Sequence, residues 1–561
     1  MIDRPEWPAR PWIYGAIAAT GGVLISLLTD HQYGDPMAIW KQIGATFVAV
    51  ATIGLVVTLE RQRWTWAVAF ALGCGAMMAL VGWFTASYNE DGTIFEFPYL
   101  SGLFAALVAA PFFQASRDAG RFNRNFADLH GYAWSDAVIG AAAIAFTGLV
   151  FGLAYMVSAL FDAIGIDLLR DLLNNEQFDW ALAGFAFGGG SGLLRESDKM
   201  LKTLLRLVIL ILGVLAPAMA VLLGLFLLAL PVTGFANLWD SGLPETPLML
   251  TSAAWAVLLT NAIIGTGDED RHPRRFFIWS AMALSFMTLP LALISAVSLG
   301  MRINQYGWTP SRIWGVIAIG FAIAYGLAAT WSLLKGRMGF DGLLRDLQVR
   351  IAMALVGAGL FLALPIVDFG AISARSQLAR LDAGKVSADE FDWRAMAFDF
   401  GPTGRKRLEA IVNGNDKVRA DFAEAALNAD NRWDVDEAQT QLATEQALDD
   451  RIIMRSEGVE LTPELRSLIA AESACQGERC ALIRLDDGRL LIVGSAFPKA
   501  IVLRSVIDPA TPQDEKPGLA EEVENPLTGD DVDLATANIE VRGEPMKRVY
   551  VDGKPVGDLF R

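Results

Sequence analysis

The chain has little of the chemistry on which most enzymes depend. Its 561 residues include three histidines and three cysteines, and residues 369–561 contain no histidine. A Ser-His-Asp triad and a histidine-containing zinc site are therefore excluded from that region. The sequence also lacks a Walker A loop and a dinucleotide-binding glycine fingerprint. No catalytic, cofactor-binding or metal-binding residue is predicted, and the pattern favours a protein that is not an enzyme.

The long apolar runs contain no ionisable residue well inside them. Charged residues such as Asp136, Asp162 and Arg206 stand at the edges of the runs. Because buried carboxylates mark proton and ion pathways in membranes, a proton-coupled transporter is not favoured. Asn261 lies inside one run, where an amide is costly unless it faces another helix. We expect a hydrogen bond between helices there, with the lining of a neutral-substrate cavity as the alternative.

Apolar residues dominate the first two thirds of the chain. The hydrophobic fraction is 53% and the mean hydropathy is +0.38, both typical of a membrane protein. A spanning helix needs about 20 mostly apolar residues. Candidate spans lie at about 12–28, 42–59, 64–86, 98–114, 137–161, 178–194, 207–230, 247–266, 276–299, 313–333 and 351–367. The predicted fold is an α-helical polytopic membrane bundle of about eleven transmembrane helices with a C-terminal soluble α+β domain.

Arginine and lysine concentrate in alternate links between these runs. The positive-inside rule places the positively charged links in the cytoplasm. This predicts a multi-pass membrane protein with a cytoplasmic N-terminus and a C-terminal domain on the opposite side, which would be the periplasm in a bacterium. The alternation requires 178–194 to cross the membrane, although that segment is short and glycine-rich enough to be re-entrant. Gly184, Gly188 and Gly192 form a stripe that predicts close helix packing, with a lipid or substrate path as the alternative.

Two further segments carry structural expectations. In residues 162–176, leucines and isoleucines lie on one helical face and acids on the other. This predicts a helix that lies on the outer surface of the membrane that the chain spans. Residues 301–312 form a polar and aromatic link, in which Thr309 and Pro310 predict a helix start. Four residues of this link are candidate interface or ligand contacts: Arg302, Tyr306, Trp308 and Arg312.

The roles expected of these four residues differ. Tyr306 and Trp308 suit a membrane–water interface. Arg302 is expected to contact an anionic headgroup, an acid of the C-terminal domain or an acid of segment 162–179. The alternative is that it pairs with a nearby carboxylate and holds its own loop.

The chain divides into three predicted parts. Residues 1–368 form the transmembrane domain, 369–473 the helical part of the periplasmic region and 474–561 its small β-rich part. Residues 369–561 hold 24 Lys and Arg against 36 Asp and Glu, so they are too acidic to favour nucleic acid as a partner. A helix is expected over 436–455. Strands are expected at 481–485, 490–493, 500–504, 538–541 and 548–551, with a hairpin turn at 486–489.

Cys475 and Cys480 are expected to form a disulfide if the C-terminal domain is periplasmic, because that compartment is oxidising. So short a ring limits chain entropy by only about 2 kcal/mol. Cys74 lies in an apolar run and is expected to be inert packing.

Several motifs in order resemble one bacterial membrane-protein family. They are Leu129–Trp134, Leu160–Ile166, Leu230–Trp239, Thr260–Asn261 and Arg302–Arg312. Over roughly residues 40–375 the chain resembles the family catalogued as "domain of unknown function 4153". The resemblance implies a multi-spanning inner-membrane protein and brings no catalytic residue with it.

Two classes of function remain open. The first is a non-catalytic envelope protein that presents a periplasmic domain to a partner or ligand. The second is a permease or flippase for a neutral or lipidic substrate. The expected partners are the lipid bilayer and a periplasmic protein, with no cofactor, and the sequence leaves the oligomeric state open.

Overall fold

The computed structural model describes residues 6–30, 37–88, 97–234, 244–267, 269–456, 459–471, 475, 479–485, 488–496, 501–507, 521–522, 547–551 and 554–560. Contacts between Cα atoms divide the chain into two compact units. Unit 1 comprises Met1–Lys385 and Ala395–Arg407, and unit 2 comprises Val386–Arg394 and Leu408–Arg561. The three-part division predicted from the sequence remains a prediction.

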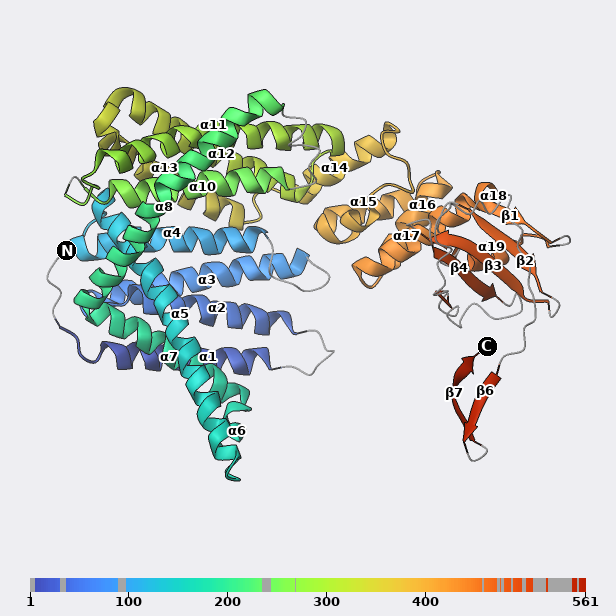
Figure 1. Cartoon of the computed structure of the whole chain (residues 1–561), viewed down its shortest axis with the longest axis horizontal. Helices are drawn as coiled ribbons and strands as arrows, with labels where there is room; N and C mark the ends of the chain where they lie inside the picture. The colour runs from blue at the N-terminus through green and yellow to red at the C-terminus, as the bar shows by residue number, and fades with distance from the viewer. Residues whose placement is uncertain are drawn as a thin grey trace. The chain divides into compact units, whose positions relative to one another are not determined.

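Unit 1 consists of helices (Figure 1). They are α1 (Arg10–Thr29), α2 (Ile39–Thr58), α3 (Trp64–Tyr88), α4 (Phe97–Ala119), α5 (Phe126–Asp162), α6 (Leu168–Leu173), α7 (Glu176–Glu196), α8 (Asp198–Thr233), α10 (Glu245–Ile264), α11 (Arg275–Tyr306), α12 (Pro310–Gly336), η1 (Arg337–Gly339), α13 (Phe340–Ala363), α14 (Phe369–Asp382), the π-helical turn η2 (Ala395–Asp399) and the first half of α15 (Gly401–Val412).

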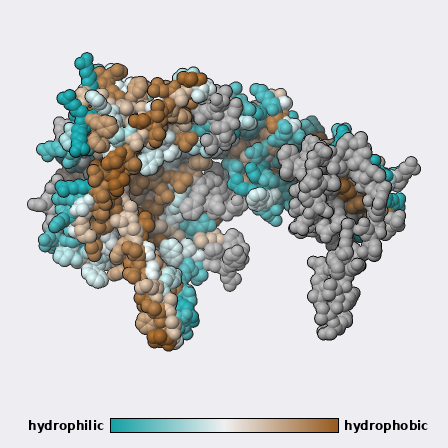
Figure 2. Space-filling view, viewed as in Figure 1, coloured by the Kyte–Doolittle hydropathy of each residue, from teal (hydrophilic) through white to brown (hydrophobic). Residues whose placement is uncertain are grey.

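Nine helical stretches in the described part of the chain are long and apolar enough to cross a membrane. Residues Pro310–Ala363 count as one stretch, and α7 is not among the nine. The outer surface of α5 and α8 is strongly apolar (Figure 2), as expected of helices that face lipid. The protein is therefore a multi-pass helical membrane protein, while the count of eleven spans is not confirmed.

The helices of unit 1 share two ends. One end holds the start of α1 and the ends of α2, α4 and α7, because Arg10 contacts Glu60 and Arg195 there and Arg117 contacts Thr58. We name it the arginine end. Asp118 at the end of α4 and Asp270 in the α10–α11 link line one cavity, so this link lies at the same end. The opposite end, here the far end, joins the end of α3, the starts of α4 and α12 and the end of α13.

A glycine seam joins α7 to α1 along the length of both helices. A Cβ atom on Gly184 would lie 2.1 Å from the carbonyl oxygen of Ala18, and one on Gly188 would lie 2.2 Å from that of Tyr14. At the other end of the seam, a Cβ on Gly22 of α1 would lie 2.2 Å from the oxygen of Trp180. The stripe therefore packs backbone against backbone, and the two helices run in opposite directions. This agrees with the alternation of links, which needs α7 to run from the far end to the arginine end.

Helices α8, α10, α11, α12 and α13 pack around the largest buried apolar cluster among the described residues. We name them the second helical group. Ala216 of α8, Ala256 of α10, Leu284 and Leu291 of α11 and Leu344 of α13 belong to this cluster. Small side chains on α8 and α10 allow close approach to the leucines of α11. α11 continues through Pro290 without a break in its helical assignment. Helices α12 and α13 pack together and turn at Arg337, whose φ of 49° falls in the left-handed region.

The segment predicted to lie on the membrane surface differs in form from the prediction. α5 continues as a helix to Asp162, and only the six residues of α6 follow before α7 begins. Ile164 and Leu168 are exposed, whereas Leu173 is buried. Asp162 and Asp167 both pair with Arg170. The acids that were expected to form one face of a continuous helix therefore hold a compact turn.

Unit 2 combines helices with a small sheet. Its helices are the second half of α15, α16 (Lys417–Asn428), α17 (Arg432–Gln446), α18 (Leu448–Arg451) and α19 (Pro463–Ala471). Trp393 is fully buried, stacks on Phe422 at 5.8 Å and meets Phe391 edge-on at 4.7 Å. Its Nε1–H donates to the carbonyl of Ala388. Segment 386–394 is thereby fixed to α16.

The strands of unit 2 form two sheets. They are β1 (Ile452–Met454), β2 (Cys480–Arg484), β3 (Leu490–Ala496), β4 (Ile501–Ile507), β5 (Glu521–Glu522), β6 (Lys547–Val551) and β7 (Lys554–Phe560). β1 to β5 pair in chain order, β1 parallel to β2 and the rest antiparallel, and β6 pairs with β7.

The predicted hairpin between β2 and β3 is present, and the helix predicted over 436–455 is wrong at its end. Gly488 provides a φ of +88° in the hairpin turn. Residues 452–454 form β1, because Ile452 and Ile453 pair with β2 and complete the sheet edge. The strand predicted at 538–541 lies outside the described residues.

The glycine seam gives a direct test of packing between α1 and α7. Gly188→Ala places a methyl group against the Tyr14 carbonyl, so α1 must move, and we expect a loss of at least about 2 kcal/mol. Gly148→Ala on α5 is the matched control, because its Cβ meets nothing within 4 Å. Thermal unfolding of purified protein in detergent should show a lower Tm for Gly188→Ala alone. Equal Tm values for both variants would contradict the seam.

Candidate functional site

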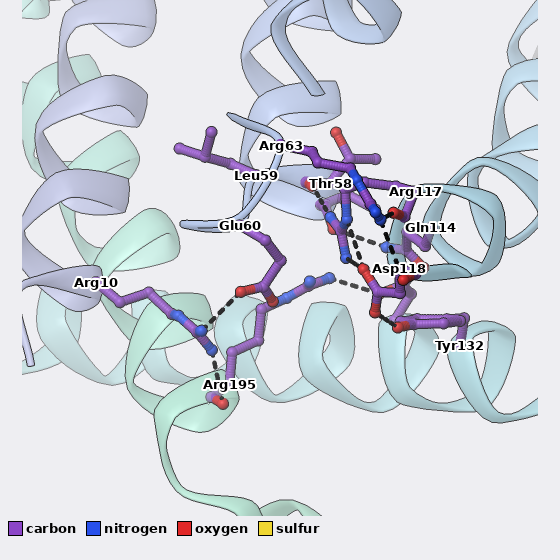
Figure 3. Close-up of polar contacts among 12 residues, drawn as sticks. Arg10, Thr58, Leu59, Glu60, Arg63, Gln114, Arg117, Asp118, Tyr132 and Arg195 are labelled. Carbon is purple, nitrogen blue, oxygen red and sulfur yellow. Dashed lines mark hydrogen bonds and ion pairs between the residues drawn. The ribbon is translucent and has the colours of Figure 1, made fainter. Parts of the chain in front are cut away.

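At the arginine end of unit 1, buried polar side chains form hydrogen bonds with the carbonyl groups at the ends of helices. A helix leaves its last carbonyl groups without backbone partners, and membrane surroundings offer few donors to replace them. Side chains from α1 and α4 supply donors to α2: the Tyr14 hydroxyl to Leu59, the Gln114 amide to Val57 and the Arg117 guanidinium to Thr58. These three contacts cap the C-terminus of α2. Figure 3 shows Arg117 beside Thr58.

Four other arginines act in the same way on other helix ends. Each guanidinium donates to carbonyl oxygens at or just beyond the end of a helix, where the partial charge is negative. The pairs are Arg10 to Arg195 O of α7 at 2.9 Å, Arg63 to Arg117 O and Asp118 O of α4, Arg345 to Ile264 O of α10 at 2.6 Å, and Arg271 to Met338 O of η1.

Carboxylates balance the charge of two buried arginines at this end, Arg10 and Arg195. Arg10 is 2% exposed and lies 2.8 Å from Glu60 and 3.6 Å from Glu196. Arg195 lies 2.5 Å from Asp136. Breaking a buried pair by removing one partner costs about 3–5 kcal/mol, because the other charge is left without compensation. The arginine end is therefore a set of coupled, buried ion pairs that join α1, α2, α5 and α7.

In the second helical group, a single buried carboxylate balances the charge of two arginines. Asp341, 2% exposed, accepts from Arg345 at 2.9 Å and lies 3.5 Å from Arg271. His272 lies next to Arg271 in the α10–α11 link. Its pKa is lowered, first by burial and then by the positive charge of Arg274. The imidazole is therefore neutral near pH 7, and the positive charge of this link is carried by arginine.

A cavity of about 400 Å³ opens at the arginine end between α4, α5, α8 and the α10–α11 link. Its described lining includes Asp118, Asp136, Asp270 and Arg195. Asp118 already pairs with Arg117 and accepts from the Tyr132 hydroxyl, and Asp136 pairs with Arg195. Groups of three or more His, Cys, Asp and Glu placed to hold a metal ion are not found among the described residues. The cavity wall is part of the ion-pair network.

Arg302 pairs with Glu245 of α10 instead of an acid of the C-terminal region or of segment 162–179. Its Nη2 lies 3.2 Å and 2.9 Å from the two carboxylate oxygens, and Glu245 is 1% exposed. This is the nearby-carboxylate alternative raised by the sequence. The pair holds the end of α11 beside the start of α10 at the far end. A ligand contact of Arg302 remains a prediction.

The link after Arg302 does dock a later segment, through its backbone. The Trp308 N–H donates to the Ser376 hydroxyl at 3.1 Å, and the Gln377 amide donates to the carbonyls of Tyr306 and Trp308, both at 2.9 Å. Gly307, with φ of 76°, turns the chain so that these groups face α14. Arg312 donates to two carbonyls of the same turn.

Other features of this link are as the sequence indicates or remain predictions. Thr309 accepts from the Arg312 N–H and caps α12, as predicted. Tyr306 and Trp308 are exposed, but their place at a membrane interface remains a prediction.

Asn261 and the cysteines complete the predicted positions. The buried Oδ1 of Asn261 has no hydrogen-bond partner among the described residues, so the expected bond between helices is not seen at that atom. The cavity nearby, lined by Thr260, Ser285 and Gln348, holds about 10 Å³. Cys475 and Cys480 are joined with their Cα atoms 5.1 Å apart. Cys74 is a free thiol in α3.

Sequence reasoning missed the structural contacts of five arginines near helix ends. Arg10, Arg117, Arg195, Arg271 and Arg345 stand among the residues that set the predicted orientation. The available signal was their position within a turn of predicted helix ends together with nearby Glu60, Asp118, Asp136 and Asp341. An arginine and an acid at the ends of neighbouring spans predict a capped and paired helix end.

The arrangement of helices, the apolar outer surface and the capped ends define an integral, multi-pass α-helical membrane protein. Residues 47–400, from within α2 to just past η2, match the family model described as "Domain of unknown function (DUF4153)", and the chain belongs to this family. The resemblance seen in the sequence is therefore confirmed. No curated protein and no solved structure matches the chain.

A substitution at Arg117 can separate the role of an arginine in capping a helix from its role in setting the orientation of the chain in the membrane. Arg117→Lys keeps the positive charge that directs topology but loses the planar fork that reaches both Thr58 O and Asp118. We expect a loss of about 2–3 kcal/mol in the free energy of unfolding, seen as a lower Tm in detergent.

The control is Arg350→Lys, because that side chain is 65% exposed and pairs with an exposed acid. It should change stability by less than about 0.5 kcal/mol. If Arg117→Lys were as stable as Arg350→Lys, charge alone would account for Arg117.

Proposed function

We propose that the chain is a non-catalytic envelope protein whose helical bundle holds unit 2 on the periplasmic side of the inner membrane, where unit 2 binds a protein partner or ligand. The proposal rests on the contacts that the buried arginines of the bundle make. Arg10, Arg117 and Arg345 contact carbonyls and carboxylates of neighbouring helices. Charge used in this way supports an anchor more than a pathway for a substrate.

The small cavity inside the second helical group also supports an anchor. At about 10 Å³, it holds about one water molecule, which is far less than a permease or flippase substrate requires. Its walls come from α10, α11, α12 and α13, and α10 carries Asn261, for which the sequence left the lining of a neutral-substrate cavity as the alternative. A flippase nevertheless remains the alternative that the experiment must exclude.

Three features support binding by unit 2 outside the cytoplasm. The positive-inside rule places the arginine end in the cytoplasm and the chain after α13 outside. The Cys475–Cys480 pair suits an oxidising compartment. Trp433, at the start of α17, is 80% exposed, and exposed tryptophans are enriched among the residues that dominate protein interfaces.

Two measurements on full-length protein test the proposal together. Alkaline phosphatase fused after Arg561 should be active, and a fusion after Arg124 should be inactive, because only periplasmic enzyme forms its disulfides. Protein reconstituted in vesicles should leave the flipping rate of a fluorescent phospholipid at the rate of protein-free vesicles. An inactive C-terminal fusion would place unit 2 in the cytoplasm. Flipping that rises with protein dose would favour the flippase.

A further inference from the structure

A second cavity, of about 120 Å³, lies within unit 1 at the far end. The ends of α3 and α13 and the starts of α4, α12 and α14 build its wall, with residues 399–401 closing one side. Trp314 stands between two other rings, stacked on Phe97 at 5.7 Å and edge-on to Phe369 at 5.6 Å. Buried Ala363 and Phe400 complete the apolar lining. The cavity is about twelve times larger than the one inside the second helical group and is large enough for one small organic headgroup.

The charge of this cavity has one sign. Two carboxylates line it, Asp368 and Asp399, and both residues are exposed. The described lining contains no Lys, Arg or His. Asp368 accepts from the Ala371 N–H at 2.8 Å and from the Thr403 hydroxyl at 2.7 Å, which leaves lone pairs of the carboxylate open to a further donor. Aromatic faces and carboxylates together favour an organic cation over an anion or a neutral chain.

The position of the cavity identifies the source of such a cation. Four of the helices that contribute to it, α3, α4, α12 and α13, belong to stretches long and apolar enough to cross a membrane. The ends of spanning helices lie at the level of the lipid headgroups, where tryptophan is enriched. An ammonium group attached to a lipid can therefore reach the cavity without leaving the bilayer.

We infer that this cavity binds the ammonium headgroup of an amine lipid such as phosphatidylethanolamine. The ammonium group lies between the carboxylates of Asp368 and Asp399 and the aromatic wall that Trp314 forms with Phe97 and Phe369, while the acyl chains remain in the bilayer. Nearly all of the lining lies within residues 47–400, the segment that matches the family model. The site is independent of the partner proposed for unit 2 and of the side of the membrane that unit 2 faces.

Lipid titration of the purified full-length protein, followed by native mass spectrometry, tests this inference. Phosphatidylethanolamine should bind about tenfold more tightly than phosphatidylglycerol with the same acyl chains, since only the former carries a cation. Equal affinity for the two lipids would overturn the proposal, because it would mean that only the apolar chains are recognised.

Two variants connect the preference to the cavity. Asp368→Asn with Asp399→Asn removes both charges, and asparagine retains the capping oxygen at the start of α14. The double variant should lose the preference, whereas Asp346→Asn, an exposed acid on α13 outside the cavity, should keep it. If the double variant misfolds, Trp314→Leu decides the matter, because it keeps an apolar wall and removes the aromatic face. A preference that survives in the folded double variant, or in Trp314→Leu, would overturn the site.

Discussion

Capping of helix C-termini by buried arginine is the interaction on which unit 1 depends. Every helix that ends at the arginine end presents carbonyl groups that the helix itself cannot satisfy. Water satisfies such groups in a soluble protein, but bundle helices packed against one another admit little of it. A guanidinium reaches several acceptors at once and carries the charge that a helix C-terminus attracts. Arg10, for example, joins α7 to Glu60 at the end of α2 with a single side chain.

This interaction gives one residue two roles. The arginines from which the positive-inside rule predicts the orientation of the chain are the same residues that cap neighbouring helices. The far end is held differently, by the Arg302–Glu245 pair and by the backbone of residues 306–308 against α14. Between the two ends, contact is made by small residues, as in the α1–α7 seam. Hydrogen bonds and ion pairs between polar side chains are therefore concentrated at the two ends of the bundle, and the aromatic cavity lies at the far end.

The sequence predicted much of the fold, because apolar length and glycine spacing are local signals. The glycine stripe at 184, 188 and 192 was expected to pack closely, and it does. The contacts of the polar residues were harder to predict, because they depend on which helices become neighbours. For Arg302 the sequence left a distant acid and a nearby carboxylate open, and only the structure identifies the partner as Glu245 at the start of α10, 57 residues earlier. The aromatic cavity was missed for the same reason, since Phe97, Trp314 and Phe369 are far apart in sequence.

A double-mutant cycle on Arg10 and Glu60 tests the central claim most directly. The single variants Arg10→Gln and Glu60→Gln, their combination and the wild type give a coupling energy that excludes effects of either residue alone. The pair is almost fully buried, so we predict a coupling of about 2 kcal/mol or more. The same cycle on the exposed Arg170–Asp162 pair should give less than about 0.5 kcal/mol. A coupling at Arg10 and Glu60 no larger than that of the exposed pair would contradict the account.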